Sequence, residues 1–238
     1  MTASEPSETI VQVYARQGYI ISMTTALITI ISFGMAITTP PLSGPFCTSG
    51  CFEYPYSDIA SRFPGDYLWM YPTMLVSLLF ILFMVAIHLR TAPGKKLFSL
   101  SGISLAILSA AVLVPNYFVQ VTVIQPSLLR GETEGIALIS QFNPHGIFIA
   151  MEEAGFFLMN IALLVIAPAF RGNGRLFRVI RITGIISFLL AVAAMLLISV
   201  KHGVMREYYF EVAIISIVWI ELIIISTFMT LVFRREMK

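Results

Sequence analysis

Apolar residues along this chain fall into six long runs, with polar residues in the segments between them. A helix needs about 20 residues to cross a hydrocarbon core of about 30 Å, and each run reaches or approaches that length. The pattern therefore predicts an all-α integral membrane protein, a bundle of six transmembrane helices. The predicted spans are Tyr19–Thr39, Leu68–Leu89, Phe98–Ile124, His145–Phe170, Ile182–Val200 and Phe210–Phe233.

Composition supports this interpretation and excludes a water-soluble globular protein. The chain is 58% hydrophobic and 12% charged, whereas soluble domains carry about 25% charged residues. Its 238 residues leave room for one membrane domain, which we place at residues 19–233, between an N-terminal segment (1–18) and a short tail (234–238). We interpret the first span as uncleaved, because Glu5 and Glu8 precede it and no small-residue cleavage site follows.

Lysine and arginine are distributed unevenly between the two sides of the predicted bundle. Both termini and the second and fourth connections share one side, which carries eleven of the 15 basic residues, against four on the other side. The positive-inside rule therefore places both termini in the cytoplasm. We expect a multi-pass protein of a prokaryotic cell membrane. The fourth connection should also bind anionic lipid headgroups through its arginines, which are Arg171, Arg175, Arg178 and Arg181.

The longest polar connection, Pro40–Tyr67, is rich in proline, glycine and aromatic residues. Turn formers at this density predict an ordered irregular cap instead of a helix. Cys47 and Cys51 are the only cysteines, and they lie on the predicted outer side, where the environment is oxidising. We therefore expect a disulfide that closes this outer loop. A redox-active pair is the alternative, while a metal site is disfavoured because nothing near Cys47 completes a ligand set.

Ionisable and amide side chains concentrate in the third, fourth and sixth predicted spans. A charged group at the centre of a membrane helix costs about 2.5–3.5 kcal/mol on insertion scales, so each is a candidate functional residue. Adjacent carboxylates inside an apolar run are the clearest case, and Tyr117 is a further candidate lining residue. The candidate ligand-binding residues are Asn116, Gln120, His145, Glu152, Glu153, Asn160, Glu211 and Glu221.

Helix phase separates the two adjacent carboxylates of the fourth span. His145 and Glu152 are seven residues apart and would be nearly eclipsed, while Glu153 is rotated by about 100° from them. Small residues near the Glu153 stripe predict close helix approach there, so we expect Glu153 to pack between helices and Glu152 to share a neighbouring face with His145. These small residues are Gly146, Ala150 and Ala154.

A purely structural role is the competing interpretation of several of these groups. Neutral amides commonly form interhelical hydrogen bonds, which fits Asn116, Gln120 and Asn160. Glu221, close to the predicted midplane, is either functional or a protonated structural donor. Two neighbouring carboxylates repel each other, so adhesion alone explains Glu152 and Glu153 less well.

The leading functional hypothesis is a membrane protein whose outward-facing polar pocket binds or transports a cation, a proton-coupled solute or a small amphiphile. Six helices are few for one transporter protomer, so homo-oligomerisation would fit this hypothesis. One alternative is an intramembrane enzyme that modifies a lipid or isoprenoid by Glu/His acid–base chemistry. Another is a non-catalytic accessory subunit. We expect a small solute, ion or lipid as partner and no nucleic acid; the sequence identifies no cofactor.

Overall fold

The computed structural model describes residues 8–170 and 174–237, and this part of the chain is helical and contains no strand. Six of its helices are long and apolar enough to cross a membrane, which confirms the prediction of an all-α, multi-pass membrane protein. These long helices are α1 (Glu8–Thr38), α2 (Met70–Arg90), α3 (Lys96–Val119), α6 (Ile147–Ile166), α7 (Arg175–His202) and α8 (Glu207–Glu236). The first begins eleven residues before the predicted start at Tyr19, so it extends into the N-terminal segment.

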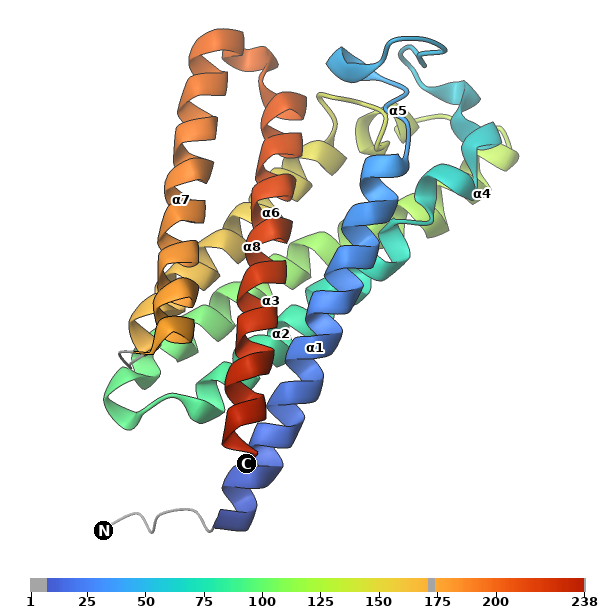
Figure 1. Cartoon of the computed structure of the whole chain (residues 1–238). Helices are drawn as coiled ribbons and strands as arrows, with labels where there is room; N and C mark the ends of the chain where they lie inside the picture. Colours follow the sequence, from blue (N-terminus) through green and yellow to red (C-terminus); the bar gives the residue numbers. More distant parts are fainter. Residues whose placement is uncertain (1–7, 171–173, 238) are drawn as a thin grey trace.

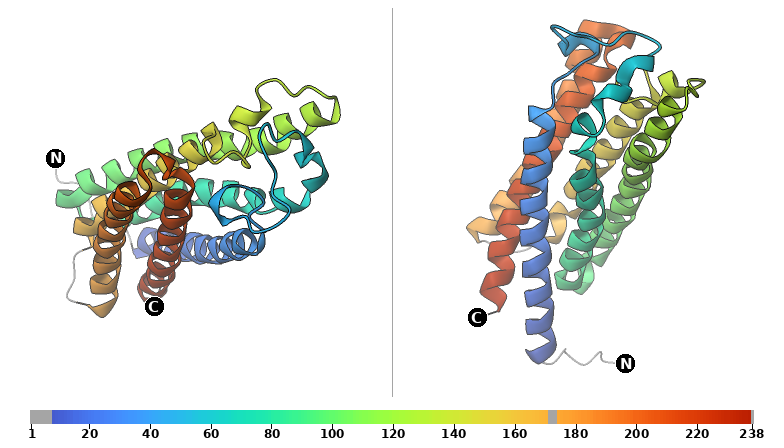
Figure 2. Two further views of the ribbon diagram at one scale, coloured as in Figure 1. Left: turned by 90° about the horizontal axis from the view of Figure 1, so that it is seen from above. Right: turned by 90° about the vertical axis from the view of Figure 1, so that its right-hand side faces the viewer.

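Five of the long helices form a closed ring. Around it, α1 packs against α2, α2 against α3, α3 against α6, α6 against α8, and α8 against α1. The remaining helix, α7, lies outside the ring against α8 and α6. Figure 1 shows α2, α3 and α6 crossing at a slant behind α1 and α8, and Figure 2 shows the same arrangement from two further directions.

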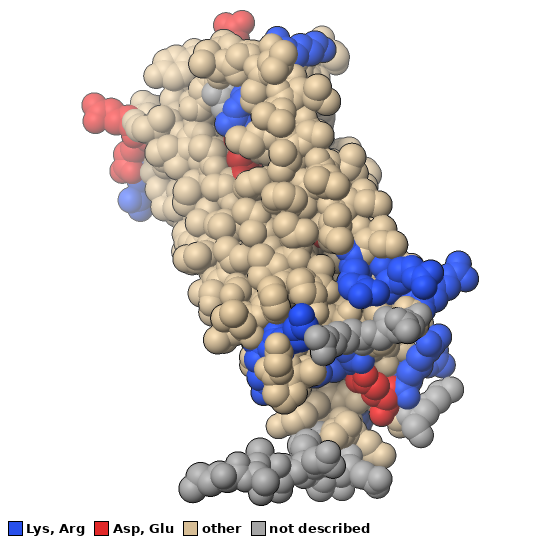
Figure 3. Space-filling view, turned by 90° about the vertical axis from the view of Figure 1, so that its left-hand side faces the viewer, with Lys and Arg blue, Asp and Glu red and all other residues tan. Residues whose placement is uncertain are grey.

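Charged side chains gather at the two ends of the bundle, and the wide band between them is almost free of charge on the face in Figure 3. We call the end that carries Cys47 and Cys51 the outer end and the opposite end the inner end. Helix α1 begins and α8 ends at the inner end (Figure 1). Arg175, Arg178 and Arg181 lie in the first turns of α7, while Arg171 lies outside the described residues.

One arginine holds three helices together at the inner end. Arg90, the last residue of α2, pairs with Glu236 at the end of α8, with Nε 2.6 Å from Oε1. The Arg90 guanidinium also lies over the Phe177 ring of α7, 4.7 Å from its centroid. These contacts fix the ends of α2, α7 and α8 relative to one another.

Helix α1 satisfies its buried hydroxyl groups within its own backbone. Ser22, Thr25, Thr29 and Ser32 are fully buried, and each donates a hydrogen bond to the carbonyl four residues earlier. Each of these four hydroxyl groups therefore has a hydrogen-bond partner although it is buried. Below them, Gly18 lies against Phe233 of α8; a Cβ at Gly18 would fall 2.5 Å from that ring. The small residues of α1 thus allow close contact with α8.

Helix α3 runs through Pro115 and changes its hydrogen-bonding pattern only further on. Residues Gln120–Ile124 form a π-helical turn that leads directly into α4 (Gln125–Leu129). A proline ring clashes with the carbonyl four residues earlier, and for Pro126 that carbonyl belongs to Thr122, inside the wider π turn. The turn therefore accommodates Pro126 without ending the helix. The short helix α5 (Ile136–Ile139) follows.

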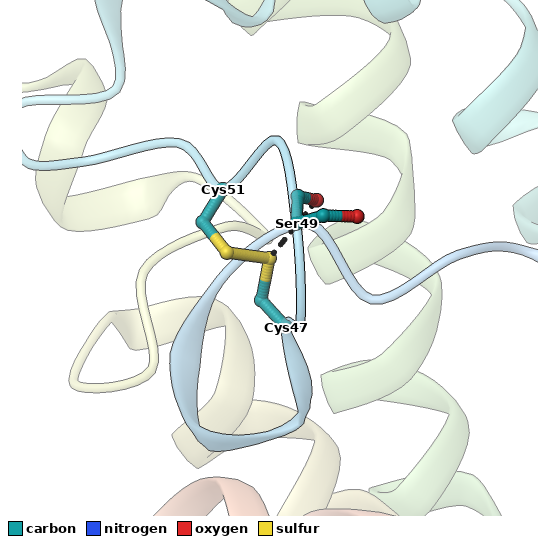
Figure 4. Close-up of a disulfide and its surroundings, with 3 residues drawn as sticks. All are labelled: Cys47, Ser49 and Cys51. Atoms are coloured by element: carbon teal, nitrogen blue, oxygen red, sulfur yellow. Dashed lines mark hydrogen bonds between the residues drawn. A yellow bond between two sulfur atoms is a disulfide. The ribbon is translucent and has the colours of Figure 1, made fainter.

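The connection between α1 and α2 is an ordered cap, as predicted. It contains only short 3-10 turns, at Gly44–Phe46, Ser57–Arg62 and Gly65–Tyr67. Cys47 and Cys51 form the predicted disulfide, with sulfurs 2.04 Å apart; Figure 4 shows Cys47 Sγ beside the Ser49 carbonyl oxygen, 3.7 Å away. The Phe46 ring packs against Tyr208 and Tyr209 of α8, which seats the cap on the outer end of that helix.

Candidate functional site

The outer half of the ring contains a pair of buried carboxyl groups from two helices. Glu152 of α6 is completely buried and Glu211 of α8 is 7% exposed. Their side chains lie within hydrogen-bonding reach of each other. Because a carboxylate only accepts hydrogen bonds, a bond between two carboxyl groups requires that one of them carries a proton. The packing of α6 against α8 therefore creates a site that can hold and release a proton.

Tyr117 of α3 completes this pair from a third helix. Its hydroxyl donates to Glu152 Oε1 at 2.6 Å, and its side chain is fully buried. The Tyr117 ring packs edge-on against Trp69 and Phe148, with centroids 5.4 and 5.8 Å away. Both rings restrict the position of the hydroxyl, so the donor to Glu152 Oε1 is held in place.

Beside this group lies a cavity of about 410 Å³ between the outer parts of α1 and α8. Six α8 residues line it, and their spacing of three and four places them on one face of the helix. They are Tyr208, Glu211, Val212, Ile215, Ser216 and Trp219. Phe33, Ala36 and Ile37 of α1 form the opposite wall, and cap residues from Pro40 to Phe46 cover the outer end.

The cavity is polar near the outer end and apolar in its depth. Glu211 lies eight residues before Trp219, which corresponds to about 12 Å along α8. At the deep end, the Trp219 ring meets Phe33 in an edge contact, with centroids 5.4 Å apart. Asp66 also lines the cavity, but its carboxylate is already held by Arg62, at 2.7 and 2.9 Å.

The second adjacent carboxylate, Glu153, has a different environment from Glu152. Its Oε2 lies 3.1 Å from Nη1 of Arg206, which precedes α8. The Arg206 guanidinium also lies 5.4 Å from the Phe210 ring centroid. The two neighbouring carboxylates thus differ in role: Glu153 forms an ion pair near the outer end, whereas Glu152 belongs to the buried pair.

The predicted amides of α3 bind main-chain groups. Asn116 Nδ2 donates to the Phe148 carbonyl of α6 at 3.0 Å. Gln120 donates to the Ile139 carbonyl at 2.6 Å and accepts from the Gln141 amide at 3.0 Å. These bonds tie α3 to the segment that enters α6. These hydrogen bonds fit the purely structural role that was the competing interpretation of the two amides.

Asn160 and Glu221 form a second, deeper pair between α6 and α8. Asn160 Nδ2 donates to Glu221 Oε2 at 2.7 Å, and both side chains are fully buried. Within the described part of the chain, Asn160 Oδ1 and Glu221 Oε1 have no hydrogen-bond partner. Gly184 of α7 packs here, since a Cβ on it would lie 3.8 Å from Glu221 Oε1. This pair does not line the cavity.

Two expectations about the fourth span were wrong. His145 is exposed and does not share a helical face with Glu152, because α6 begins at Ile147 and the extended backbone of Gly146 breaks the assumed helical phase. Of the three small residues, Gly146 does lie close to other main-chain atoms, since a Cβ on it would fall 2.9 Å from the Leu138 carbonyl oxygen, but Ala150 and Ala154 are exposed and do not mark a helix interface. The close approach instead occurs at Gly155, where a Cβ would lie 2.5 Å from the Leu113 side chain of α3.

Two aromatic residues of the cavity were absent from the predicted site. Trp69 and Trp219 line the cavity, and they are the only two tryptophans of the chain. The sequence contains a partial signal for the cavity, because Tyr208, Glu211 and Trp219 share one face of the sixth span. The opposing helix could not be identified from sequence, since nothing in the pattern indicates that α1 and α8 are neighbours.

Comparison with known proteins adds no family assignment. No family model, curated protein or solved structure matches this chain. Its function must therefore be inferred from its own geometry. Among the residues described here, no group of three or more His, Cys, Asp and Glu side chains is arranged to hold a metal ion.

Proposed function

We propose that this polytopic membrane protein binds a small amphiphile in the cavity between α1 and α8 and acts as a carrier or receptor for it. The observation that carries this proposal is the lining of the cavity, which has a carboxyl group near its outer end and aromatic and aliphatic side chains below it. Its volume of about 410 Å³ lies within the 300–1,000 Å³ typical of small-molecule sites. The buried pair Glu152–Glu211 is the polar end of this site.

The orientation of the cavity supports a ligand that enters from the membrane. Ile37 of α1 is 68% exposed and Val212 of α8 is 41% exposed, and both line the cavity. On transmembrane helices such positions face lipid, so the rim opens sideways between α1 and α8. A ligand dissolved in the membrane would reach Glu211 with its head group and the Phe33–Trp219 contact with its tail.

The two alternative functions, an intramembrane enzyme and an accessory subunit, receive less support from the residues of the site. Acid–base catalysis by histidine and glutamate needs an imidazole beside the carboxyl pair, and the partners of Glu152 are Tyr117 and Glu211. An accessory subunit would need no cavity with an acidic end. Proton coupling remains compatible with the proposal, because two adjacent carboxyl groups can share a proton.

The two tryptophans allow a direct test, because both line the cavity. A bromine atom quenches indole fluorescence on contact, so ω-bromo-octanol should quench Trp69 and Trp219 in a saturable manner in protein reconstituted into lipid nanodiscs. Ala36→Phe should fill the cavity and abolish the saturable component. Leu27→Phe, at a 55% exposed position of the same helix, is the matched control. Quenching that never saturates, or that Ala36→Phe leaves unchanged, would refute the proposal.

We propose the membrane orientation on the charge count alone: termini in the cytoplasm of a prokaryotic cell and the cap outside, with Arg171, Arg175, Arg178 and Arg181 at anionic headgroups. Single cysteines at Thr2 and Lys238 should react with an impermeant maleimide only in inside-out vesicles. A cysteine at Glu53, which is exposed in the cap, should react only from the other side. Homo-oligomerisation stays a prediction.

A further inference from the structure

The charges around the cavity indicate the class of amphiphile. Two acidic residues line it, Asp66 and Glu211, and none of its described lining residues is Lys, Arg or His. Asp66 is paired with Arg62, whereas Glu211 faces another carboxyl group, that of Glu152. Two adjacent carboxyl groups can share one proton, so the pair can hold one negative charge, which no Lys, Arg or His among the described lining residues balances. An anionic head group placed there would be repelled.

The walls of the cavity favour the same sign of ligand. Six aromatic rings line it, and the faces of aromatic rings attract cations, tryptophan most strongly. Organic ammonium groups bind well among such rings because they are large and weakly hydrated. The six rings are Phe33, Phe46, Trp69, Phe142, Tyr208 and Trp219.

The hydrogen-bond arrangement behind Glu211 leaves it available to a ligand. Tyr117 donates to Glu152 Oε1, and Glu152 in turn holds Glu211. Within the described residues, Glu211 Oε2 has no hydrogen-bond partner although it is buried. A head group that enters the cavity would thus meet a carboxyl group that belongs to this pair, and a cation there would be balanced by the ionised member of the pair.

On these three observations, and resting on the proposed function, we propose that the amphiphile is an organic cation, an alkylammonium whose head group binds between Glu211 and the aromatic rings. A primary or tertiary ammonium can donate a hydrogen bond to Glu211, and a quaternary ammonium binds by charge and ring contacts alone. The alkyl chain extends along α8 toward Trp219. The ligand enters the cavity from the membrane with its charge at the outer end.

The test compares three ω-bromo-octyl compounds that differ only in head group: a trimethylammonium, an alcohol and a carboxylate. Quenching of Trp69 and Trp219 in nanodiscs of neutral lipid gives each affinity, with the Ala36→Phe protein as the reference for partitioning into lipid. We expect the ammonium to bind at least about tenfold more tightly than the alcohol and the carboxylate to bind most weakly. Equal affinities, or tightest binding of the carboxylate, would overturn the inference.

Substitution of the carboxyl groups supplies the second arm. The double variant Glu152→Gln/Glu211→Gln keeps the size of both side chains but removes the negative charge of the pair, so it should weaken ammonium binding about tenfold and change alcohol binding less than twofold. Glu53→Gln removes an exposed charge of the cap and should change neither. If the double variant weakens both ligands equally, the carboxyl pair acts by shape and the cation assignment fails while the amphiphile proposal stands. If no compound quenches saturably, the proposed function itself fails.

Discussion

Removal of the Tyr117 hydroxyl should weaken the bundle through its effect on Glu152. In Tyr117→Phe the ring and its contacts with Trp69 and Phe148 stay, and only the 2.6 Å hydrogen bond to Glu152 Oε1 is lost. Glu152 is completely buried, so no water replaces the missing donor. The destabilisation should therefore report this single bond between α3 and α6.

The size of the effect follows from two competing estimates. Hydrogen bonds to charged groups in water-soluble proteins contribute about 1.5–3 kcal/mol. Interhelical hydrogen bonds in membranes average about 0.6 kcal/mol and reach about 1.7 kcal/mol, because the unfolded chain in the membrane also finds partners. The membrane value governs here, and a short, fully buried bond belongs near its upper end. We expect a coupling energy of about 1–1.7 kcal/mol.

A double-mutant cycle measures this coupling. The free energy of unfolding is determined in mixed micelles with increasing sodium dodecyl sulfate for wild type, Tyr117→Phe, Glu152→Leu and the double variant. Tyr14→Phe serves as control, because Tyr14 is 44% exposed and its hydroxyl loss should change stability by less than about 0.5 kcal/mol. A coupling energy within error of zero would show that Tyr117 does not hold Glu152.

Four further substitutions probe the fold around the site, each read out as thermal unfolding in detergent. Gly155→Ala should destabilise the bundle by about 1–3 kcal/mol, because the added Cβ would overlap the buried Leu113 side chain. The control Gly34→Ala has open space around it and should leave the stability unchanged. Equal effects of the two substitutions would contradict the close packing at Gly155. Cys47→Ser opens the disulfide loop and should lower the free energy of unfolding by about 2 kcal/mol, because the unfolded chain gains entropy. A reductant should destabilise the wild type to the same extent and leave the stability of the variant unchanged. Asn160→Leu should lower the free energy of unfolding by about 1 kcal/mol. Glu221→Gln should lower it less, because the glutamine amide can still form a hydrogen bond with Asn160. The reverse order would refute the assignment of the Asn160–Glu221 pair.

The helices were predictable because their apolar runs are long, and the membrane leaves few alternatives for such runs. The disulfide was predictable because Cys47 and Cys51 are the only cysteines and lie four residues apart. Glu152 and Glu211 were both identified as candidates, since a carboxyl group in an apolar helix is costly wherever it points.

The grouping of these candidates was less predictable, because it depends on which helices are neighbours and where each helix begins. The assumed start of the fourth span at His145 was two residues too early, and this error joined His145 to Glu152. The cavity depends on the contact between α1 and α8, whose sequences carry no mutual signal. Asn116 and Gln120 were identified by residue type, yet their partners are main-chain carbonyl and amide groups that no side-chain pattern reveals.

Photolabelling reports whether an amphiphile occupies the outer cavity. An octyltrimethylammonium with a diazirine at the end of its chain would be activated in the nanodisc-bound protein, and the adducts mapped by mass spectrometry. We predict adducts in the outer part of α1 around Phe33 and Ile37 and in α8 between Val212 and Trp219, with loss of both in Ala36→Phe. Adducts spread over the lipid-facing side of α7, or labelling of α1 and α8 that Ala36→Phe leaves intact, would show that the ligand does not occupy this cavity.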